Sequence, residues 1–302
     1  MVLIVVLYAL LASTFVLAKK SLTFASPCFL IGFRMTLAGI FLLGYHRVCT
    51  KKLKLPEPQD RWLFFKMTLF HIYLAFILEF WALRYITALK TTIIYAITPF
   101  VAAFLSYLLL GERLTTFKTI GILVGCAGLI PVLLAGATSQ EAFMVLGSMS
   151  LPEIVLLISV VSSCYAWFLV KELMKKGYNL GFINGVAMFF GGIMSLFTSF
   201  AIEPMGDMVI VWGPFLGWVL ALIVVANLMV YNLYGYLLQH YSITLMTVAG
   251  FLTPTFATVF EWLFMDGVIT WHYAASLVLV TLGLFIFCWH DLKKRSIMHY
   301  DR

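Results

Sequence analysis

The sequence predicts an all-α integral membrane protein with ten transmembrane helices, arranged as two inverted five-helix repeats. The 302 residues are 63% hydrophobic and 11% charged, with a mean hydropathy of +1.03. A water-soluble domain of this length could not cover so much apolar surface with so few charges. The apolar residues gather in ten stretches, each close to the roughly 20 residues that a helix needs to cross a bilayer. In addition, a segment that begins at Thr98 returns in weaker form at Thr253.

The ten apolar stretches follow one another with short connections, as in an antiparallel bundle. The first stretch has neither a basic leader nor a small-residue cleavage site, so we interpret it as a retained span. The connection 136–152 divides the chain into two halves, 1–135 and 153–290, and a basic tail, 291–302, follows them. The predicted spans are residues 2–18, 27–46, 62–83, 88–110, 117–135, 153–172, 180–202, 212–238, 242–264 and 270–290.

The repeat relates the fourth span to the ninth at an offset of 155 residues, about half of the chain. Each half holds five spans, an odd number, so the second half enters the membrane upside down. Inverted repeats of this kind are typical of secondary transporters, whose solute binds near mid-membrane where the halves meet. The matching pairs are Thr98 with Thr253, Pro99 with Pro254, Ala102 with Ala257, Leu108 with Leu263, and Thr115 with Thr270.

Lysine and arginine residues predict the orientation, because cytoplasmic loops carry an excess of them. With the N-terminus inside, the inner loops and the tail hold fourteen basic residues, whereas the outer loops hold only Lys19, Lys20, Arg84 and Lys90. We therefore expect both termini in the cytoplasm and the chain in a bacterial inner membrane. Because the charge of +7 belongs to these loops, it does not indicate nucleic-acid binding. The expected partners are the lipid bilayer and a small-molecule solute, and a homodimer stays open.

The sequence carries little that would support membrane-bound catalysis. Its five cysteines form no CxxC pair and no metal-ligand spacing, and it has no nucleotide-binding loop. We therefore expect no metal and no cofactor, and a gradient or an exchange reaction as the energy source. An integral membrane enzyme would need convergent acid, base or metal ligands, and no such set is present. A non-transporting assembly or sensor subunit would share these sequence features and would differ from a transporter only in moving no solute, so this alternative stays open.

Ionisable residues within the predicted spans are the first candidates for solute binding, because charge is costly in a bilayer. Arg34 lies about eight residues into the second span, which places it roughly 10 Å below the outer surface. Glu79 lies near the outer end of the third span. The two could form a structural ion pair, or Arg34 could hold a carboxylate and Glu79 an ammonium or sulfonium group. Glu261, near the outer end of the ninth span, offers a second negative charge.

Proline residues interrupt the fourth and ninth spans at corresponding positions, Pro99 and Pro254. A proline frees a backbone carbonyl and kinks a helix. Broken helices at matching places in inverted halves are a sequence pointer to a central binding site. Helix shaping alone is the other interpretation of these prolines. His71, in the third span, could relay protons or could be a neutral packed side chain.

Aromatic and amide side chains complete the set of candidate binding residues. Their ring faces would suit a nucleobase or a cation, although packing between helices is the alternative for each of them. The eighth span presents three of them on one helical face. These candidates are Tyr8, Phe15, Tyr165, Trp167, Asn227, Tyr231 and Tyr234.

Several of these features together resemble the drug/metabolite transporter superfamily, in its EamA-like branch. They are the five-plus-five spans, an arginine early in the second span, the run from Ala82 to Leu89, and the block from Thr98 to Gly111-Glu112-Arg113-Leu114-Thr115. The second half departs from the pattern, since Asp266-Gly267 replaces Gly-Glu and no arginine of the seventh span matches Arg34. The resemblance covers nearly the whole chain and implies a ten-span metabolite transporter.

Within that family, the chain is similar overall to the S-adenosylmethionine carriers of obligate intracellular bacteria. This similarity implies uptake of S-adenosylmethionine, with S-adenosylhomocysteine as the solute given in exchange. The carboxylates and aromatic rings fit an organic cation or zwitterion with an aromatic part. A cationic solute would enter down the membrane potential, which is worth about 2.3 kcal/mol per charge per 100 mV. Export of amino acids or other metabolites, common in the family, is the alternative.

Overall fold

The computed structural model is helical throughout the part of the chain that it describes. There the backbone forms no β-strand and has one isolated antiparallel bridge, between Ala25 and Val209. Five stretches in this part are long and apolar enough to cross a membrane, namely 27–48, 58–82, 151–175, 180–202 and 212–238. The described residues are 2–49, 55–83, 85, 94–95, 97–112, 115–128, 130, 151–204, 206, 208–253, 256, 259–260, 275, 278–283 and 285–287.

The chain forms two compact units, and each unit combines segments from both halves of the sequence. Unit 1 comprises residues 1–12, 87–150 and 241–302, and unit 2 comprises 13–86 and 151–240. The first helix, α1 (Val2–Leu22), contributes residues to both units. The predicted halves therefore interleave within each unit.

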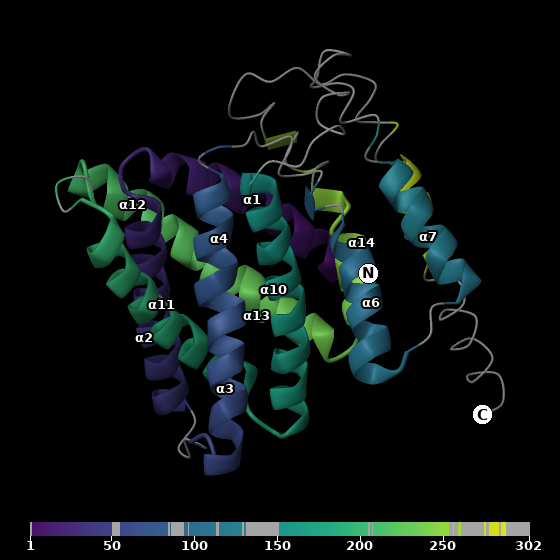
Figure 1. Cartoon of the computed structure of the whole chain (residues 1–302), viewed down its shortest axis with the longest axis horizontal. Helices are drawn as coiled ribbons and strands as arrows, with labels where there is room; N and C mark the ends of the chain where they lie inside the picture. Colours follow the sequence, from purple (N-terminus) through teal and green to yellow (C-terminus); the bar gives the residue numbers. More distant parts are fainter. Residues whose placement is uncertain are drawn as a thin grey trace. The chain divides into compact units, whose positions relative to one another are not determined.

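Unit 2 contains the longest apolar helices. Figure 1 shows the stretches 27–48, 58–82, 151–175 and 180–202 running roughly along one another, whereas 212–238 crosses them obliquely. Two of the predicted spans, 180–202 and 212–238, coincide with helical stretches of the structure. The third span is continuous with a short 3₁₀ turn, and both the third and the eighth spans contain a π-helical segment. The elements are α2 (Pro27–Cys49), η1 (Pro58–Asp60), α3 (Arg61–Thr68), η2 (Leu69–Leu74, π), α4 (Ala75–Ala82), α10 (Leu151–Lys175), α11 (Leu180–Ile202), α12 (Trp212–Leu222), η4 (Ile223–Val230, π) and α13 (Tyr231–Leu238).

Helices α2 and α11 form the closest helix pair of unit 2, and they run antiparallel. Gly32 of α2 faces Leu196, whereas Gly39, seven residues later, faces Phe189. A Cβ atom on Gly39 would lie 2.4 Å from the backbone nitrogen of Phe189. Small residues at such a seam let two backbones approach closely, which is how helices associate where the surrounding lipid is as apolar as their side chains.

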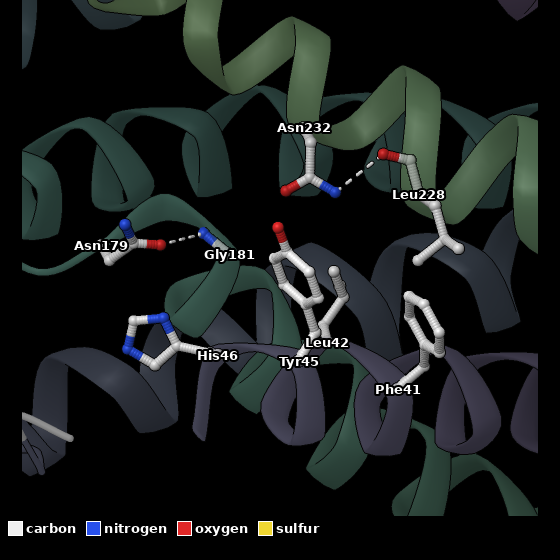
Figure 2. Close-up of a pocket in the computed structure, with 8 residues that line it drawn as sticks. All are labelled: Phe41, Leu42, Tyr45, His46, Asn179, Gly181, Leu228 and Asn232. Carbon is white, nitrogen blue, oxygen red and sulfur yellow. Dashed lines mark hydrogen bonds between the residues drawn. The ribbon is translucent and has the colours of Figure 1, made fainter. Parts of the chain in front are cut away.

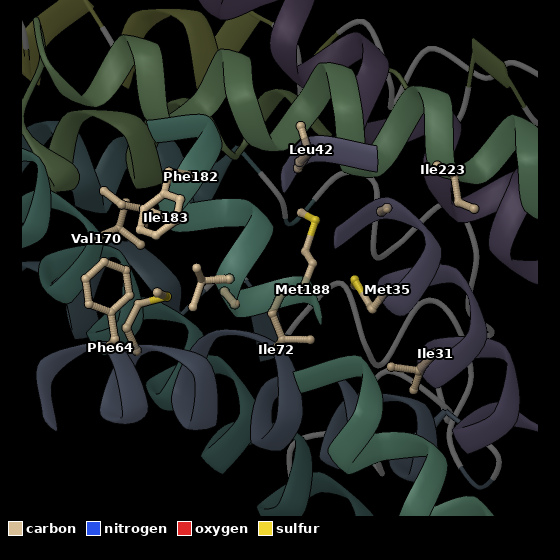
Figure 3. Close-up of a cluster of buried hydrophobic side chains, with 14 of the residues drawn as sticks. Ile31, Met35, Leu42, Phe64, Ile72, Val170, Phe182, Ile183, Met188 and Ile223 are labelled. Carbon is tan, nitrogen blue, oxygen red and sulfur yellow. The ribbon is translucent and has the colours of Figure 1, made fainter. Parts of the chain in front are cut away.

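The hydrophobic core of unit 2 lies around this seam (Figure 3). Met35 of α2 and Met188 of α11 are fully buried there, and Ile72 of the π segment η2 packs beside them. Flexible methionine side chains fill irregular gaps such as those beside a π turn. The core therefore holds α2, α11 and the third span together as one packed body.

The described helices of unit 1 are shorter than the long apolar helices of unit 2. The hydroxyl of Tyr8 in α1 donates a hydrogen bond to the carbonyl of Met246. Ser242 caps α14, and its side chain accepts a hydrogen bond from the amide of Leu245 at 3.1 Å. Gly111 ends α6 in the left-handed conformation, with φ of 66°, which a residue without a Cβ adopts at no steric cost. The named helices of this unit are α6 (Thr98–Leu110), α7 (Thr116–Ala127) and α14 (Ile243–Ala249).

The fourth predicted span, 88–110, is not a single helix in its described part. Ile97 forms a turn, and α6 begins at Thr98 with Pro99 in its first turn. Proline fits that position, because the first amides of a helix have no intrahelical acceptor. Several predicted features lie outside the described residues: Pro254, Glu261, Arg84, Lys90, most of the connection 136–152 and the tail 291–302.

Candidate functional site

Arg34 of α2 is the most deeply placed charged side chain among the predicted site residues of unit 2, with 3% of its surface exposed. Its guanidinium carbon lies 5.0 Å from the ring centroid of Phe76 and 5.7 Å from that of Phe80. The carboxylate of Glu79 also interacts electrostatically with it. A buried guanidinium needs such partners, because transfer of an unpaired charge out of water is costly. The site therefore places a cation against two rings and a carboxylate.

The rings near Arg34 continue into a connected aromatic wall, made of Phe76, Phe80, Trp167, Tyr231 and Tyr234. Phe76 lies 6.4 Å from Tyr231, which in turn lies 5.7 Å from Trp167. Trp167 stacks on Tyr234 with centroids 4.1 Å apart. These separations are those of favourable aromatic pairs, so the wall is a set of ring faces that adjoins a buried charge.

His71 occupies the middle of this aromatic wall. Its ring lies 4.6 Å from Trp167 and 5.1 Å from Tyr231, edge-on to both. Only 1% of His71 is exposed, and neither ring nitrogen has a hydrogen-bond partner within the described structure. Buried polar atoms without partners are uncommon and often mark a functional position. His71 thus adds a polar group to the wall. The sequence analysis gave two interpretations of it, a proton relay and a neutral packed side chain, and both stay open.

Two π-helical segments position the wall. His71 belongs to η2, and Tyr231 follows directly after η4. When η2 is shifted by the 155-residue offset of the sequence repeat, it falls within η4. Under the same shift, Phe76 falls on Tyr231. Since π turns occur frequently at functional sites, this matched pair draws attention to the third and eighth spans.

The structure brings five predicted site residues into this one region: Arg34, Glu79, Trp167, Tyr231 and Tyr234. Asn227 lies elsewhere, because its amide nitrogen contacts the sulfur atoms of Met35 at 2.8 Å and Met188 at 3.7 Å. The sequence analysis placed Asn227 on one face with the two tyrosines. The π turn that contains it has i→i+5 hydrogen bonds, which changes the angular spacing that an α-helix would have given.

Of the remaining predicted site residues, one packs against another ring of unit 2, two belong to unit 1, and three are not described in full. Tyr165 packs edge-on against Phe70 at 5.2 Å. Tyr8 and Pro99 belong to unit 1. The helix at Phe15 is described but its side chain is not, and both Pro254 and Glu261 lie outside the described residues.

Phe76 and Phe80 are central to the site, and sequence reasoning did not select them. They are two of 27 phenylalanines, and an aromatic residue in a span usually faces lipid or packs. The one available signal was their spacing of four residues around Glu79, which places them on neighbouring positions of one helical face. Their contact with Arg34 depends on a second helix, so no local pattern could reveal it.

At one end of unit 2, a buried carboxylate binds the start of α2. Glu203, which follows α11, accepts hydrogen bonds from the backbone amides of Cys28 at 2.8 Å and Phe29 at 3.0 Å. The hydroxyls of Ser26 and Ser199 each donate to it at 2.7 Å. The first amides of a helix lack intrahelical acceptors, and the helix dipole favours an anion beside them. Glu203 thus caps α2 from 175 residues away.

The pKa of Glu203 reflects these bonds. Burial by itself would raise the pKa of the carboxyl, but the hydrogen bonds from Ser26, Ser199 and the two amides outweigh it and hold the pKa below its ordinary range. A backbone hydrogen bond also closes this end: the amide of Ser26 donates to the carbonyl of Met208 at 3.1 Å. This end of unit 2 is therefore sealed by a carboxylate that stays ionised at neutral pH.

At the opposite end of unit 2, Asp60 has an equivalent place before α3. It is 3% exposed, pairs with the ammonium of Lys176 and accepts a hydrogen bond from the hydroxyl of Tyr178 at 2.8 Å. The same hydroxyl accepts a hydrogen bond from the amide of Glu57 at 3.1 Å. The hydrogen bond to Asp60 raises the pKa of Lys176, and burial raises the pKa of Tyr178. This cluster joins the connection before α3 to the one before α11.

Two pockets open on unit 2. One, of about 330 Å³, is lined by residues near the Glu203 end: Leu22, Ala25, Ser26, Pro27, Phe80, Leu83 and Ile210. The other, of about 390 Å³, lies between the end of α2, the start of α11 and α13. In Figure 2, the amides of Asn232 and Asn179 border this second pocket and each is hydrogen-bonded to nearby backbone. The first pocket is the one that reaches the aromatic wall, through Phe80.

A helical membrane protein with a buried charge and an aromatic wall in its apolar spans has the features of a membrane transporter. The profile of the EamA-like transporter family matches residues 1–134 and 150–289, and the chain belongs to this family. It is therefore a multi-pass membrane transporter, and the alternative of an integral membrane enzyme is set aside. The resemblance to the EamA-like branch is confirmed.

Curated relatives give a more specific comparison. The chain is 32% identical to an S-adenosylmethionine/S-adenosylhomocysteine transporter of Chlamydia trachomatis serovar L2, over 84% of this chain and 78% of that protein. It is 33% identical to the transporter of the same name from Chlamydia muridarum, over 84% and 80%. A crystal structure of another protein superposes with a TM-score of 0.75 at 19% identity, over 95% of this chain and 96% of that one. The last likeness concerns the fold alone.

Proposed function

We propose that this transporter takes up S-adenosylmethionine and releases S-adenosylhomocysteine in exchange. The observation that carries the proposal is the 32–33% identity, over 84% of the chain, to transporters that bear these two solutes in their names. The aromatic wall beside Arg34 supports it chemically. S-adenosylmethionine has a carboxylate, two cationic centres and an adenine, and the site offers a guanidinium, the carboxylate of Glu79 and several ring faces.

Each chemical part of the solute has a counterpart in unit 2. Arg34 would bind the carboxylate through its planar donors, as guanidinium groups do. Glu79 would attract the ammonium group, and the rings of Trp167 and Tyr231 would stack on the adenine. Exchange of a cation for a neutral product carries net positive charge inward, so the membrane potential would drive uptake.

We further propose ten spans in two inverted repeats, in a bacterial inner membrane, with both termini in the cytoplasm. The two matches of the family profile, the matched π segments and the antiparallel pairing of α2 with α11 support the repeat. The distribution of basic residues supports the orientation. In it, the Glu203 end of unit 2 faces outward. A cysteine placed at position 52 in a cysteine-free variant should resist an impermeant reagent added outside, and labelling there would reverse the orientation.

Counterflow in proteoliposomes tests the function. Vesicles loaded with S-adenosylhomocysteine should accumulate labelled S-adenosylmethionine faster than empty vesicles. Arg34→Ala should abolish this exchange while the protein stays folded in the membrane, because the solute carboxylate loses its partner. Equal accumulation in loaded and empty vesicles, together with clear flux of an amino acid, would replace the proposal with amino-acid export.

A further inference from the structure

One pocket of unit 2 lies near the Glu203 end and has one lining residue, Phe80, in common with the site around Arg34. Its rim includes Pro27 and Ser26, whose hydroxyl donates a hydrogen bond to Glu203, and its volume is about 330 Å³. Phe80 lines the same pocket. Because Phe80 is also one of the two rings that Arg34 approaches, a solute in this pocket meets the aromatic wall at that side chain first.

The ring faces of Phe76 and Phe80 already hold a cation in this structure. Arg34 lies within about 6 Å of both centroids, the range in which a ring quadrupole attracts a positive charge. The two rings lie 6.2 Å apart, and Phe80 is 4% exposed. A cation–π contact is strongest where water is excluded, so these faces suit a cationic centre of the solute as well as they suit the guanidinium.

We propose that Phe76 and Phe80 form the subsite for the sulfonium centre of the solute, which enters through the Glu203-end pocket and displaces Arg34 from the rings. This inference rests on the proposed function and specifies its site. The exchange is balanced in charge: the sulfonium takes the place of the guanidinium over the rings, and the displaced guanidinium meets the carboxylate of the same solute. No covalent bond changes.

The subsite would distinguish the two exchanged solutes. S-adenosylmethionine differs from S-adenosylhomocysteine by one methyl group and by the positive charge on sulfur. Only the charged form can replace Arg34 over the rings, whereas both forms carry the carboxylate, the ammonium and the adenine. Phe76 and Phe80 are therefore specificity-determining residues that favour the methylated solute when both compete at the outer face.

The test compares binding of the two solutes to purified full-length protein. In the double variant Phe76→Leu and Phe80→Leu, we expect the ratio of the affinity for S-adenosylmethionine to that for S-adenosylhomocysteine to fall about tenfold to thirtyfold, in line with desolvated cation–π contacts. Most of this change should come from tighter binding of S-adenosylhomocysteine, because Arg34 no longer gives up a ring contact when it meets the carboxylate. For S-adenosylmethionine, the sulfonium and the guanidinium lose the same ring contact, so its own affinity should change less than about threefold. Phe33→Leu is the matched control, because Phe33 is a partly buried phenylalanine of unit 2 that packs against Phe29 and Phe215, and it should leave the ratio unchanged.

A second pair of variants keeps the test decisive if the leucine variant fails to fold. Trifluorophenylalanine at positions 76 and 80 preserves ring size but removes the negative potential of the ring face. The preference for S-adenosylmethionine should fall with it. An unchanged preference in the fluorinated protein would overturn the subsite and leave the transporter's function intact. Absence of binding for both solutes in the unmodified protein would overturn the proposed function itself.

Discussion

The two ends of unit 2 are both closed by a buried carboxylate, but the carboxylates are satisfied in different ways. At one end, Glu203 accepts hydrogen bonds from two backbone amides and two hydroxyls, and these donors are all neutral. At the other end, Asp60 meets the ammonium of Lys176, whose side chain is 43% exposed, and the hydroxyl of Tyr178. The first end relies on donors fixed by a helix start, whereas the second relies on side chains.

This difference matters for how each end responds to its surroundings. Backbone amides at a helix start cannot rotate away, so the Glu203 end is preorganised and little affected by salt. An exposed lysine loses side-chain entropy when it pairs and is screened by ions, so the Asp60 end is more easily loosened. In the proposed orientation, the firmer end faces outward and holds the rim of the pocket at Phe80.

The largest expected effect comes from forcing α2 and α11 apart, which would weaken both ends of unit 2 together. Gly39→Ala would place a Cβ 2.4 Å from the backbone of Phe189, so α2 and α11 must separate. We expect a loss of about 3 kcal/mol or more, at the upper end of overpacking costs. Because both ends depend on this seam, hydrogen exchange should rise equally in residues 24–30 and 56–61.

Gly44→Ala is the matched control on the same helix, since no atom lies within 4 Å of the added Cβ. It should be neutral or slightly stabilising, because alanine favours a helix more than glycine does. Faster exchange at one end only in the Gly39→Ala protein would show that the other end is independent of the seam.

The second-largest effect is confined to the Glu203 end of unit 2. Glu203→Gln removes the charge that the amides of Cys28 and Phe29 face, and should cost about 2 kcal/mol, as hydrogen bonds to charged groups do. Because folding lowers the pKa of Glu203, its stabilisation is complete above the unfolded-state pKa and is lost as the pH falls through the folded value. The difference in melting temperature between the two proteins should therefore shrink in acid. A difference that stays constant from neutral pH to below pH 3 would contradict the ionised cap.

The smallest effect belongs to the Asp60 end. Lys176→Met should lower the melting temperature less than Glu203→Gln does, and the loss should disappear at about 1 M salt, where the Debye length is about 3 Å. Because folding raises the pKa of Lys176, its contribution is present below the unfolded-state pKa and is lost as the pH rises through the folded value. The contribution of Lys176 should thus be lost in alkali, whereas that of Glu203 is lost in acid.

Lys175→Met is the control for this last change, because Lys175 is also exposed and lies one residue earlier at the end of α10. It should change neither stability nor its salt dependence. An equal loss in both variants would mean that general charge, rather than the contact with Asp60, stabilises this end.

Sequence reasoning identified the membrane class and the family, and it selected several of the residues that the structure brings together around Arg34. Arg34 and Glu79 were visible because charged residues are rare within apolar spans, so their position alone indicated a role. Glu203 was not visible as a cap, since a single acidic residue after a span reveals nothing of amides that lie 175 residues away. The phenylalanines at 76 and 80 were missed for the same reason: their importance comes from a partner on another helix.

The π segment η2 has a consequence for the angular phase of the third span. A helix that contains a π turn carries one residue more than a regular α-helix of the same path, so the part after it is rotated relative to the part before it. Phe76 and Phe80 lie after the segment, and Leu63 and Met67 lie before it. Deleting one residue from 69–74 would therefore restore a regular α-helix on the same path and leave both rings facing Arg34, whereas the same deletion in the regular helix would turn them by about 100°. A relative with a one-residue gap there would keep both the helix and the contact.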